Sequence, residues 1–338
     1  MRERNQTVDA LRAVAALWVC LWHFTLGTGI GAQGYLGVTM FFVISGYIVP
    51  YSMMRGGYTI AAWPTFMLKR LARLEPPYLA SIVVILALGA WDALRGFPPR
   101  WTAAQIAGHL GYANAFLGLP WLNGTYWSLA VEFQFYVLMG LALPMLMRAR
   151  TPTKRLAGLA LASCLPLLLP ARSNATILPF LPVFAAGILT FLRATNRIGR
   201  TSYWAALPVL AGIVFKVQDA GVALATVGTA VLIAAVRIPR IAPLAWLGAI
   251  SYSLYLLHVP IGYRVMNVIE KSFTGALVPV AAIIGALAAS IAGAALFRRY
   301  VEQPSLRLAA HIGYRAPLFD SQVAAPSPPG RVVGDGEI

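Results

Sequence analysis

The stretch "VDALRAVAALWVCLWHF", residues 8–24, is almost entirely apolar, yet it holds Arg12 and His23. A run of about 20 apolar residues is long enough to cross the hydrocarbon core of a membrane as a helix. Charged side chains at that depth are costly unless they are paired or hydrated, so each one is a functional candidate. Because the two residues are eleven positions apart, or roughly 16 Å and three helical turns, they share one face. A simpler interpretation pairs Arg12 with Asp9 at the headgroups and gives His23 a hydrogen bond to a neighbouring helix.

The composition of the whole chain also indicates a membrane protein. Of its 338 residues, 59% are hydrophobic and 11% are charged, and the mean hydropathy is +0.70, whereas soluble domains contain roughly 25% charged residues. Cys20 and Cys164 both lie in apolar runs, which argues against a disulfide framework and a thiolate metal site. The net charge of +16 comes from basic residues that punctuate apolar runs. A nucleic-acid module would gather them on one polar face, so we expect no nucleic-acid partner.

The apolar runs predict an all-α fold, a polytopic bundle of about ten transmembrane helices. The spans are expected at residues 10–29, 35–54, 77–94, 126–147, 156–171, 177–193, 203–217, 220–236, 242–262 and 276–297. Residues 100–122 are less apolar and rich in Gly, Asn and Trp, which favours an interfacial or re-entrant excursion over a further span. We therefore expect a transmembrane domain over residues 1–311 and a disordered cytoplasmic tail over residues 312–338.

The basic residues predict the orientation of these spans. With the N-terminus in the cytoplasm, 21 of the 27 Lys and Arg residues fall in inside segments and 6 in outside segments. Cytoplasmic loops keep such an excess, so we expect a protein of the inner membrane with both termini cytoplasmic. The first span resembles a cleaved signal peptide, but nine further spans and a histidine within it argue against that interpretation.

The segment "TFMLKRLARLEPPYLA", residues 65–80, carries Arg70 and Arg73 on one helical face at the expected cytoplasmic mouth of the third span. Two guanidinium groups on one face suit a phosphate-rich ligand, because each can chelate oxygens in a bidentate manner. The alternative is a basic anchor that contacts anionic membrane lipid. Pro76 and Pro77 predict a break in the helix just before the membrane.

The segment "NGTYWSLAVEFQFYVL", residues 123–138, places Ser128, Glu132 and Tyr136 four residues apart on one stripe. A carboxylate about one turn into the hydrocarbon should face a polar cavity or a cation. The alternative is a structural hydrogen bond from Glu132 to Ser128 or to a neighbouring helix. Trp127 is expected either at a substrate site or in the interfacial aromatic belt.

Two later segments add further candidates. "AISYSLYLLHVPIGY", residues 249–263, holds Ser251, Tyr255 and His258 at helical spacing. Its aromatic stripe suits core packing, and the alternative to a substrate contact for His258 is a hydrated interfacial residue near the outer end. In "FRRYVEQPSLRL", residues 297–308, Glu302 follows the last span and should pair with a nearby arginine.

Six of these segments, in the same order over residues 5–308, resemble the acyltransferase-3 family of integral membrane acyltransferases. The matching motifs are R-x10-H at Arg12 and His23 with Asp9 before it, "MFFVISGYI" (40–48), R-x-x-R-x-x-P-x-Y from Arg70 to Tyr78, "WSLAVEFQFY" (127–136), "SYSLYLLHVP" (251–260) and "VEQP" (301–304). Six ordered motifs are far more specific than any one short pattern.

The resemblance implies transfer of an acyl group, usually acetyl, from cytoplasmic acyl-CoA to a hydroxyl of a glycan or lipid-linked sugar. It also implies a catalytic R-x10-H pair and a donor-binding R-x-x-R motif. Imidazole has an ordinary pKa near 6.5, so His23 suits a general base for the hydroxyl, and neither a bound cofactor nor a metal is expected. The candidate catalytic residues are His23, Arg12, Asp9 and Glu132, the donor-binding residues are Arg70 and Arg73, and the substrate-binding residues are Trp127, Ser128, Tyr136, Tyr255 and His258.

Two other functions remain open from the sequence. The same chemistry could acylate a small molecule or natural product, since no acceptor pocket is readable. Alternatively, intramembrane Arg, His and Glu residues could carry protons or an anion through a transporter or flippase. Against the transporter, the two halves of the chain show no visible repeat.

Overall fold

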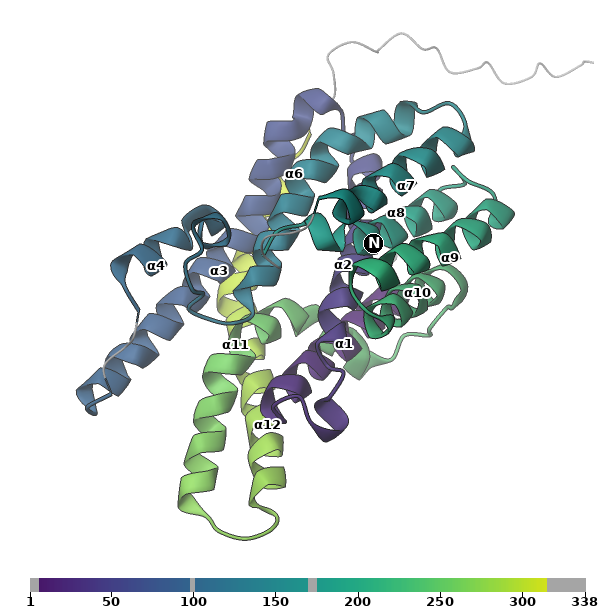
Figure 1. Cartoon of the computed structure of the whole chain (residues 1–338). Helices are drawn as coiled ribbons and strands as arrows, with labels where there is room; N and C mark the ends of the chain where they lie inside the picture. The colour runs from purple at the N-terminus through teal and green to yellow at the C-terminus, as the bar shows by residue number, and fades with distance from the viewer. Residues whose placement is uncertain (1–5, 98–100, 170–174, 315–338) are drawn as a thin grey trace, which may run out of the picture.

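The computed structural model describes residues 6–97, 101–169 and 175–314, and within these ranges helices are the only regular secondary structure (Figure 1). Residues 315–338 of the predicted tail lie outside the described residues. The same holds for four of the basic residues used to predict the orientation, Arg2, Arg4, Arg100 and Arg172. The helices are α1 (Gln6–Phe24), α2 (Leu36–Arg55), α3 (Trp63–Leu94), α4 (Ala103–Gly108), α5 (Asn114–Leu117), α6 (Tyr126–Arg148), α7 (Pro152–Leu168), α8 (Leu181–Ala194), α9 (Arg200–Val217), α10 (Ala220–Ala235), α11 (Ala242–Ser272), α12 (Val278–Phe297) and α13 (Gln303–His311), with a π-helical turn at Arg298–Glu302 before α13.

The predicted all-α membrane bundle is confirmed. Among the described residues, α1, α2, α3, α6, α11 and α12 are long and apolar enough to cross a membrane, and α8 and α10 are shorter apolar helices. Each of the ten predicted spans overlaps a helix, although α1 ends five residues early and α3 and α11 are longer than predicted, while the number of helices that cross the membrane stays a prediction. Residues 101–122 form only short helices, the longest of six residues, as expected for an excursion.

The predicted break at Pro76 and Pro77 is wrong, because α3 continues through both prolines. A proline inside a helix removes one backbone hydrogen bond and usually kinks or ends the helix. Membrane helices tolerate the loss where neighbouring helices pack against them. Here Tyr252 of α11 donates to the carbonyl of Leu74, two residues before Pro76, at 2.9 Å. This contact holds α3 beside α11, so the face that carries Arg70 and Arg73 continues into the bundle.

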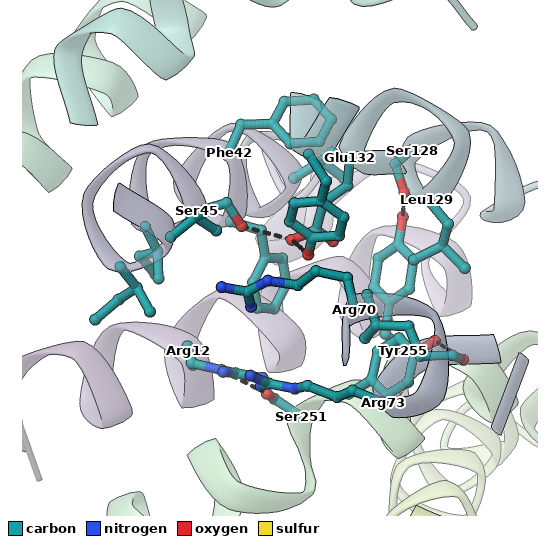
Figure 2. Close-up of a pocket in the computed structure, with 18 of the residues that line it drawn as sticks. Arg12, Phe42, Ser45, Arg70, Arg73, Ser128, Leu129, Glu132, Ser251 and Tyr255 are labelled. Atoms are coloured by element: carbon teal, nitrogen blue, oxygen red, sulfur yellow. Dashed lines mark hydrogen bonds between the residues drawn. The ribbon is translucent and has the colours of Figure 1, made fainter. Parts of the chain in front are cut away.

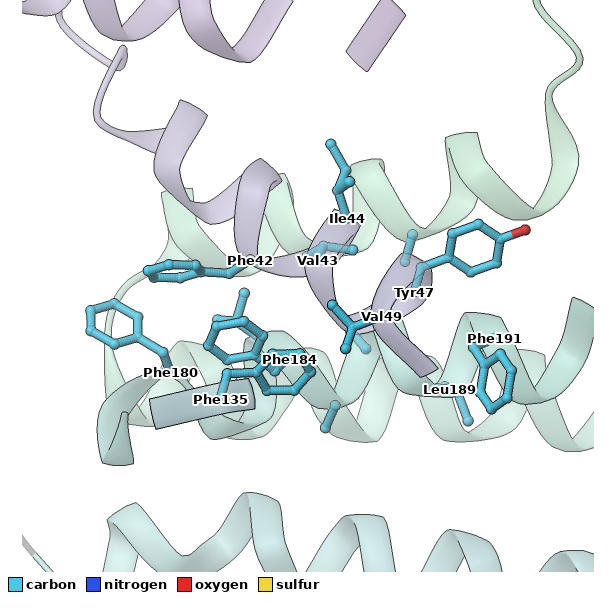
Figure 3. Close-up of a cluster of buried hydrophobic side chains, with 14 of the residues drawn as sticks. Phe42, Val43, Ile44, Tyr47, Val49, Phe135, Phe180, Phe184, Leu189 and Phe191 are labelled. Atoms are coloured by element: carbon cyan, nitrogen blue, oxygen red, sulfur yellow. The ribbon is translucent and has the colours of Figure 1, made fainter. Parts of the chain in front are cut away.

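A buried aromatic cluster fixes α2 against α6 and α8 (Figure 3). Phe135 of α6 stacks on Phe184 of α8 with ring centroids 4.2 Å apart, and Phe42 of α2 packs on the same Phe184 ring. Gly46 and Gly187 lie where α2 meets α8, and a Cβ at either position would collide with the backbone of the other helix. Small residues let membrane helices approach closely. The polar residues of α2 and α6 are therefore held on a rigid frame.

The helix ends divide into two groups. At one end, Thr7 donates to the carbonyl of Val236 at 2.9 Å, and Arg155 donates to the carbonyl of Arg197 at 3.1 Å. We call this the basic end; it contains residues 56–62, 149–151, 195–199 and 236–241. The other group is the opposite end, which contains residues 25–35, 118–125, 218–219 and 273–277. The two cavities of the candidate active site lie between these ends.

Candidate active site

A cavity of about 100 Å³ lies where α1, α2, α3, α6 and α11 meet (Figure 2). We call it the arginine cavity, because three guanidinium groups reach into it. Its polar lining residues are Arg12, Ser45, Arg70, Arg73, Ser128, Glu132, Tyr136, Ser251, Tyr252, Tyr255 and Glu302. The predicted stripe of Ser128, Glu132 and Tyr136 therefore faces a polar cavity, as expected, and it does so beside both predicted arginine motifs.

Arg12 is held in place by α11. Its Nε donates to the hydroxyl of Ser251 at 3.1 Å, and that hydroxyl donates to the carbonyl of Gly248 at 2.9 Å. A Cβ at position 248 would collide with the backbone of Asp9, so only glycine allows α1 and α11 to approach this closely. Asp9 is buried at this helix crossing. It lines neither the arginine cavity nor the second cavity, which contains His23.

Arg70 crosses the space between α3 and α2. Its Nη2 donates to the hydroxyl of Ser52 at 2.8 Å, and its guanidinium lies over the rings of Phe66 and Tyr136, at 5.2 and 5.3 Å from their centroids. Such cation–π contacts stabilise a charge that has lost water. They leave the remaining guanidinium N–H groups available to an anionic ligand.

Glu132 accepts two short hydrogen bonds on Oε1, one from Ser45 of α2 and one from Tyr136, each 2.6 Å. The structural bond to a neighbouring helix therefore exists, but its donor is Ser45 and not Ser128. Glu302 accepts from Arg298 at 3.2 Å and from Ser253 at 2.6 Å, which confirms its predicted pairing.

The charges of the arginine cavity do not cancel. Because Glu302 is paired with Arg298, the single carboxylate of Glu132 faces Arg12, Arg70 and Arg73. An excess of buried positive charge is expensive unless an anion compensates it. The cavity therefore favours an anionic ligand with several oxygens, such as a phosphate ester.

A second cavity, of about 530 Å³, opens toward the opposite end of the bundle. We call it the histidine cavity, because His23 lines it. Its other polar and aromatic lining residues are Trp22, Tyr35, Thr39, Trp121, Thr125, Trp127, Phe180, Gln218, Asp219 and Tyr255. It contains no arginine or lysine among its described residues, so it differs in kind from the arginine cavity.

Val38 and Tyr255 line both cavities and stand between them. The hydroxyl of Tyr255 shares a hydrogen bond of 2.6 Å with Ser128 and donates to the carbonyl of Thr125 at 3.2 Å, which fixes the ring. A single cavity shared by Arg12, His23 and Glu132 is one arrangement that the sequence permits. The structure instead places His23 on the far side of the Tyr255 ring.

His23 rests against a second histidine. The Nδ1 of His258 lies 2.9 Å from the carbonyl of Tyr255 and 3.0 Å from that of Leu254. Carbonyl oxygens only accept, so this Nδ1 carries a proton, and Nε2 of the neutral ring is an acceptor. The Nε2 of His258 lies 3.1 Å from the Nδ1 of His23, and this Nδ1 is also 2.9 Å from the carbonyl oxygen of Val19. The hydrogen-bond network thus assigns the proton of His23 to Nδ1 and leaves a lone pair on Nε2.

This geometry corrects the expectation for His258. It is fully buried behind His23 and is not a hydrated residue of the outer surface. Its side chain orients His23 and reaches neither cavity, so a direct contact with substrate is not what the structure offers. The spacing of residues 251, 255 and 258 could not reveal this, because the partner lies on α1.

Sequence reasoning missed several residues of the two cavities. Ser45 and Tyr252 line the arginine cavity, and Trp22 and Trp121 line the histidine cavity. Ser45 is a polar residue within an apolar run, which is the signal that could have identified it. The tryptophans gave no such signal, because they are equally typical of the interfacial belt.

Comparisons with known proteins show the family of the chain. A family model described as an acyltransferase domain, that of the acyltransferase-3 family, matches residues 5–299. The chain is 30% identical over 294 residues to the putative membrane-bound transacylase BcsY of Komagataeibacter xylinus, covering 77% of this chain and 73% of that protein.

Two shorter similarities point to the same chemistry. The peptidoglycan O-acetyltransferase OatA of Listeria monocytogenes is 29% identical over 150 residues, or 40% of this chain and 24% of that protein. A putative O-acetyltransferase of Staphylococcus aureus is 30% identical over 145 residues, or 38% of this chain and 23% of that protein. No solved structure matches. Because the family model matches nearly the whole chain, the chain belongs to the acyltransferase-3 family and is an acyltransferase. Its long apolar helices make it a multi-pass membrane protein.

Proposed function

We propose that the chain transfers an acetyl group from acetyl-CoA to a hydroxyl of a cell-envelope glycan or a lipid-linked sugar. The observation that carries this proposal is the pair of unlike cavities on either side of Tyr255. In the inner membrane, with both termini in the cytoplasm, the basic end faces the compartment that holds acyl-CoA. The acceptor then enters the histidine cavity from the other side.

The arginine cavity suits the donor. Acyl-CoA carries phosphates at one end and a thioester at the tip of a long, thin pantetheine arm. Arg70 and Arg73 would hold phosphate oxygens near the basic end, because guanidinium groups bind them in a bidentate manner. Arg12 and His23 are roughly 16 Å apart along α1, and the extended arm would place the thioester beside Tyr255. No bound cofactor is needed for this transfer.

His23 supplies the base. Its Nε2 lone pair would take the proton of the acceptor hydroxyl while the hydroxyl oxygen attacks the thioester carbonyl carbon. The tetrahedral intermediate then collapses, the carbon–sulfur bond breaks, and the thiolate of CoA takes the proton from His23. The Nε2 of His258 accepts a buried hydrogen bond from the Nδ1 of His23 and so keeps that Nδ1 protonated. The Nε2 of His23 therefore remains the basic atom.

The histidine cavity suits a sugar. Sugar rings have apolar C–H faces and polar edges, and this cavity combines Trp22, Trp121 and Trp127 with Gln218 and Asp219. Ligand sites of this kind are mostly apolar and aromatic with a few polar groups that orient the ligand. The name of the Listeria relative, a peptidoglycan O-acetyltransferase, also favours a glycan acceptor.

The test is direct transfer. Protein in lipid nanodiscs is given acetyl-CoA with a labelled acetyl group, and the label is followed into surface glycan isolated from cells that lack this protein. NMR of surface glycan from cells with and without the protein identifies the O-acetyl signals that depend on it. Label that appears only in low-mass products would favour a small-molecule acceptor. If the wild type shows no more acetyl transfer or acetyl-CoA hydrolysis than a His23→Ala variant, the result would favour a transporter.

A further inference from the structure

A third cavity, of about 950 Å³, lies at the basic end, on the other face of α2 from the arginine cavity. Tyr47 and Tyr51 of α2 line it, whereas Ser45, Ile48 and Val49 of the same helix line the arginine cavity. Its remaining walls come from α8, α9, α10 and the start of α1. Because α2 stands between the arginine cavity and this third cavity, the third cavity is a separate site. The proposed transfer reaction does not use it.

Three arginines define the charge of this cavity. Arg193 at the end of α8, Arg200 at the start of α9 and Arg237 just after α10 all line it. No Asp or Glu is among the described lining residues, and none of the three arginines forms an ion pair within the described part of the chain. Asn196, within 3.5 Å of Arg193, adds an amide to the same wall. Such a set of donors fits the oxygens of a phosphate group.

The surroundings of the cavity distinguish between sources of phosphate. Trp204, which lines the cavity, is 40% exposed, and further exposed apolar residues lie on α9 and α10 and just after α10: Val209, Leu224, Leu232 and Val236. The helices α8, α9 and α10 lie side by side, away from α3 and α4 (Figure 1). In a membrane protein such an exposed apolar surface contacts acyl chains. A ligand here would have its phosphate in the cavity and hydrocarbon outside it.

We infer that this cavity binds the phosphate headgroup of an anionic phospholipid, whose acyl chains lie along α9 and α10. The tryptophan at its rim is placed as expected for a residue at the headgroup level. A soluble nucleotide offers the same phosphate chemistry but no hydrocarbon, so it would leave the apolar rim unused. Because Tyr47 and Tyr51 belong to α2, the bound headgroup would also stabilise the packing of α2 on α8.

The test compares the full-length protein in phosphatidylcholine nanodiscs with and without phosphatidylglycerol. Quenching of Trp204 fluorescence by brominated phosphatidylglycerol, taken as the difference between wild type and Trp204→Phe, reports occupancy. Arg237→Gln, in a loop outside the helices, should weaken occupancy about tenfold, as expected for loss of one charge-assisted hydrogen bond. Arg193→Gln and Arg200→Gln should act in the same way. Native mass spectrometry should show correspondingly less retained phosphatidylglycerol.

The matched control is Arg150→Gln, an exposed arginine at the same end of the bundle that does not line the cavity. General attraction to an anionic surface predicts an equal loss for Arg150→Gln and Arg237→Gln, and that result would overturn the inference. Protection of the wild type from quenching by adenosine 3′,5′-bisphosphate, at concentrations where inorganic phosphate has no effect, would instead assign the site to a nucleotide and also overturn it. Acetyl transfer is assayed in parallel and tests the proposed function separately.

Discussion

The arginine cavity and the histidine cavity share one wall but differ in charge, lining and position. The first brings three guanidinium groups together with Glu132 and with Glu302, which is paired with Arg298, and the second surrounds the imidazole of His23 with aromatic rings toward the opposite end. A ligand rich in phosphate is suited to the first, and a neutral sugar is suited to the second. Under the proposed function, donor and acceptor are recognised in separate cavities, which share only Val38 and Tyr255 as lining residues.

The largest effect is expected at the base. His23→Ala should lower acetyl transfer by about 100-fold or more, the usual contribution of a general base, while the protein remains in the membrane at a normal level. Transfer to labelled glycan in nanodiscs measures this. His311→Ala, at an exposed position near the end of α13, is the control and should leave transfer unchanged. Retention of more than about a tenth of the wild-type turnover would remove His23 from the role of base.

Arg70→Ala and Arg73→Ala should each raise KM for acetyl-CoA by about tenfold or more, since a hydrogen bond to a charged group contributes roughly 1.5–3 kcal/mol. KM for the acceptor should change little, because the two substrates occupy different cavities. Lysine at either position should rescue only in part, as it keeps the charge but loses the bidentate geometry. Unchanged KM values for acetyl-CoA in all four variants would assign these arginines to lipid anchoring.

His258 sharpens the account of the histidine cavity, because it acts through His23. His258→Leu should lower kcat by about tenfold through loss of the orienting hydrogen bond, with both KM values nearly constant. His258→Gln keeps an acceptor near the position of Nε2 and should recover most of the turnover. Equal losses of kcat in the leucine and glutamine variants, with both proteins folded, would mean that the volume of His258 matters and its acceptor does not.

The smallest effect is expected at the aromatic wall. Trp127→Ala should raise KM for the glycan by about fivefold, since an aromatic contact contributes on the order of 1 kcal/mol beyond the area it buries. Trp246→Ala, an exposed tryptophan of α11 that lines neither cavity, is the control. A larger change in KM for acetyl-CoA than for glycan would reverse the assignment of the two cavities.

Much of the fold was predictable, because the hydrophobic pattern of a membrane helix is local. The ten apolar runs, the stripe of Ser128, Glu132 and Tyr136, and the shared face of Arg70 and Arg73 all follow from spacing alone. The continuation of α3 through Pro76 was not predictable, because the contacts that stabilise it come from other helices.

The rest of the site depends on contacts between helices far apart in the chain. Ser45 bonds Glu132 across 87 residues, and His258 meets His23 across 235. Spacing shows which residues share a face, but it does not show which helix packs against that face. The division of the site by Tyr255 was hidden for the same reason, since the ring of one helix fills space between residues of two others.

The central claim, that the two cavities face opposite sides of the membrane, is tested most directly by sided cysteine labelling. In a background of Cys20→Ala and Cys164→Ala, Gly124→Cys introduces a thiol in the histidine cavity, where a side chain meets open space, and Ile48→Cys introduces one in the arginine cavity. A hydrophilic, membrane-impermeant thiol reagent is then applied to spheroplasts and to inverted vesicles. We predict that Gly124→Cys is labelled only in spheroplasts, and that Ile48→Cys is labelled only in inverted vesicles and is protected by acetyl-CoA. Labelling of both positions from the same side, or labelling of Ile48→Cys that acetyl-CoA leaves unchanged, would contradict the account.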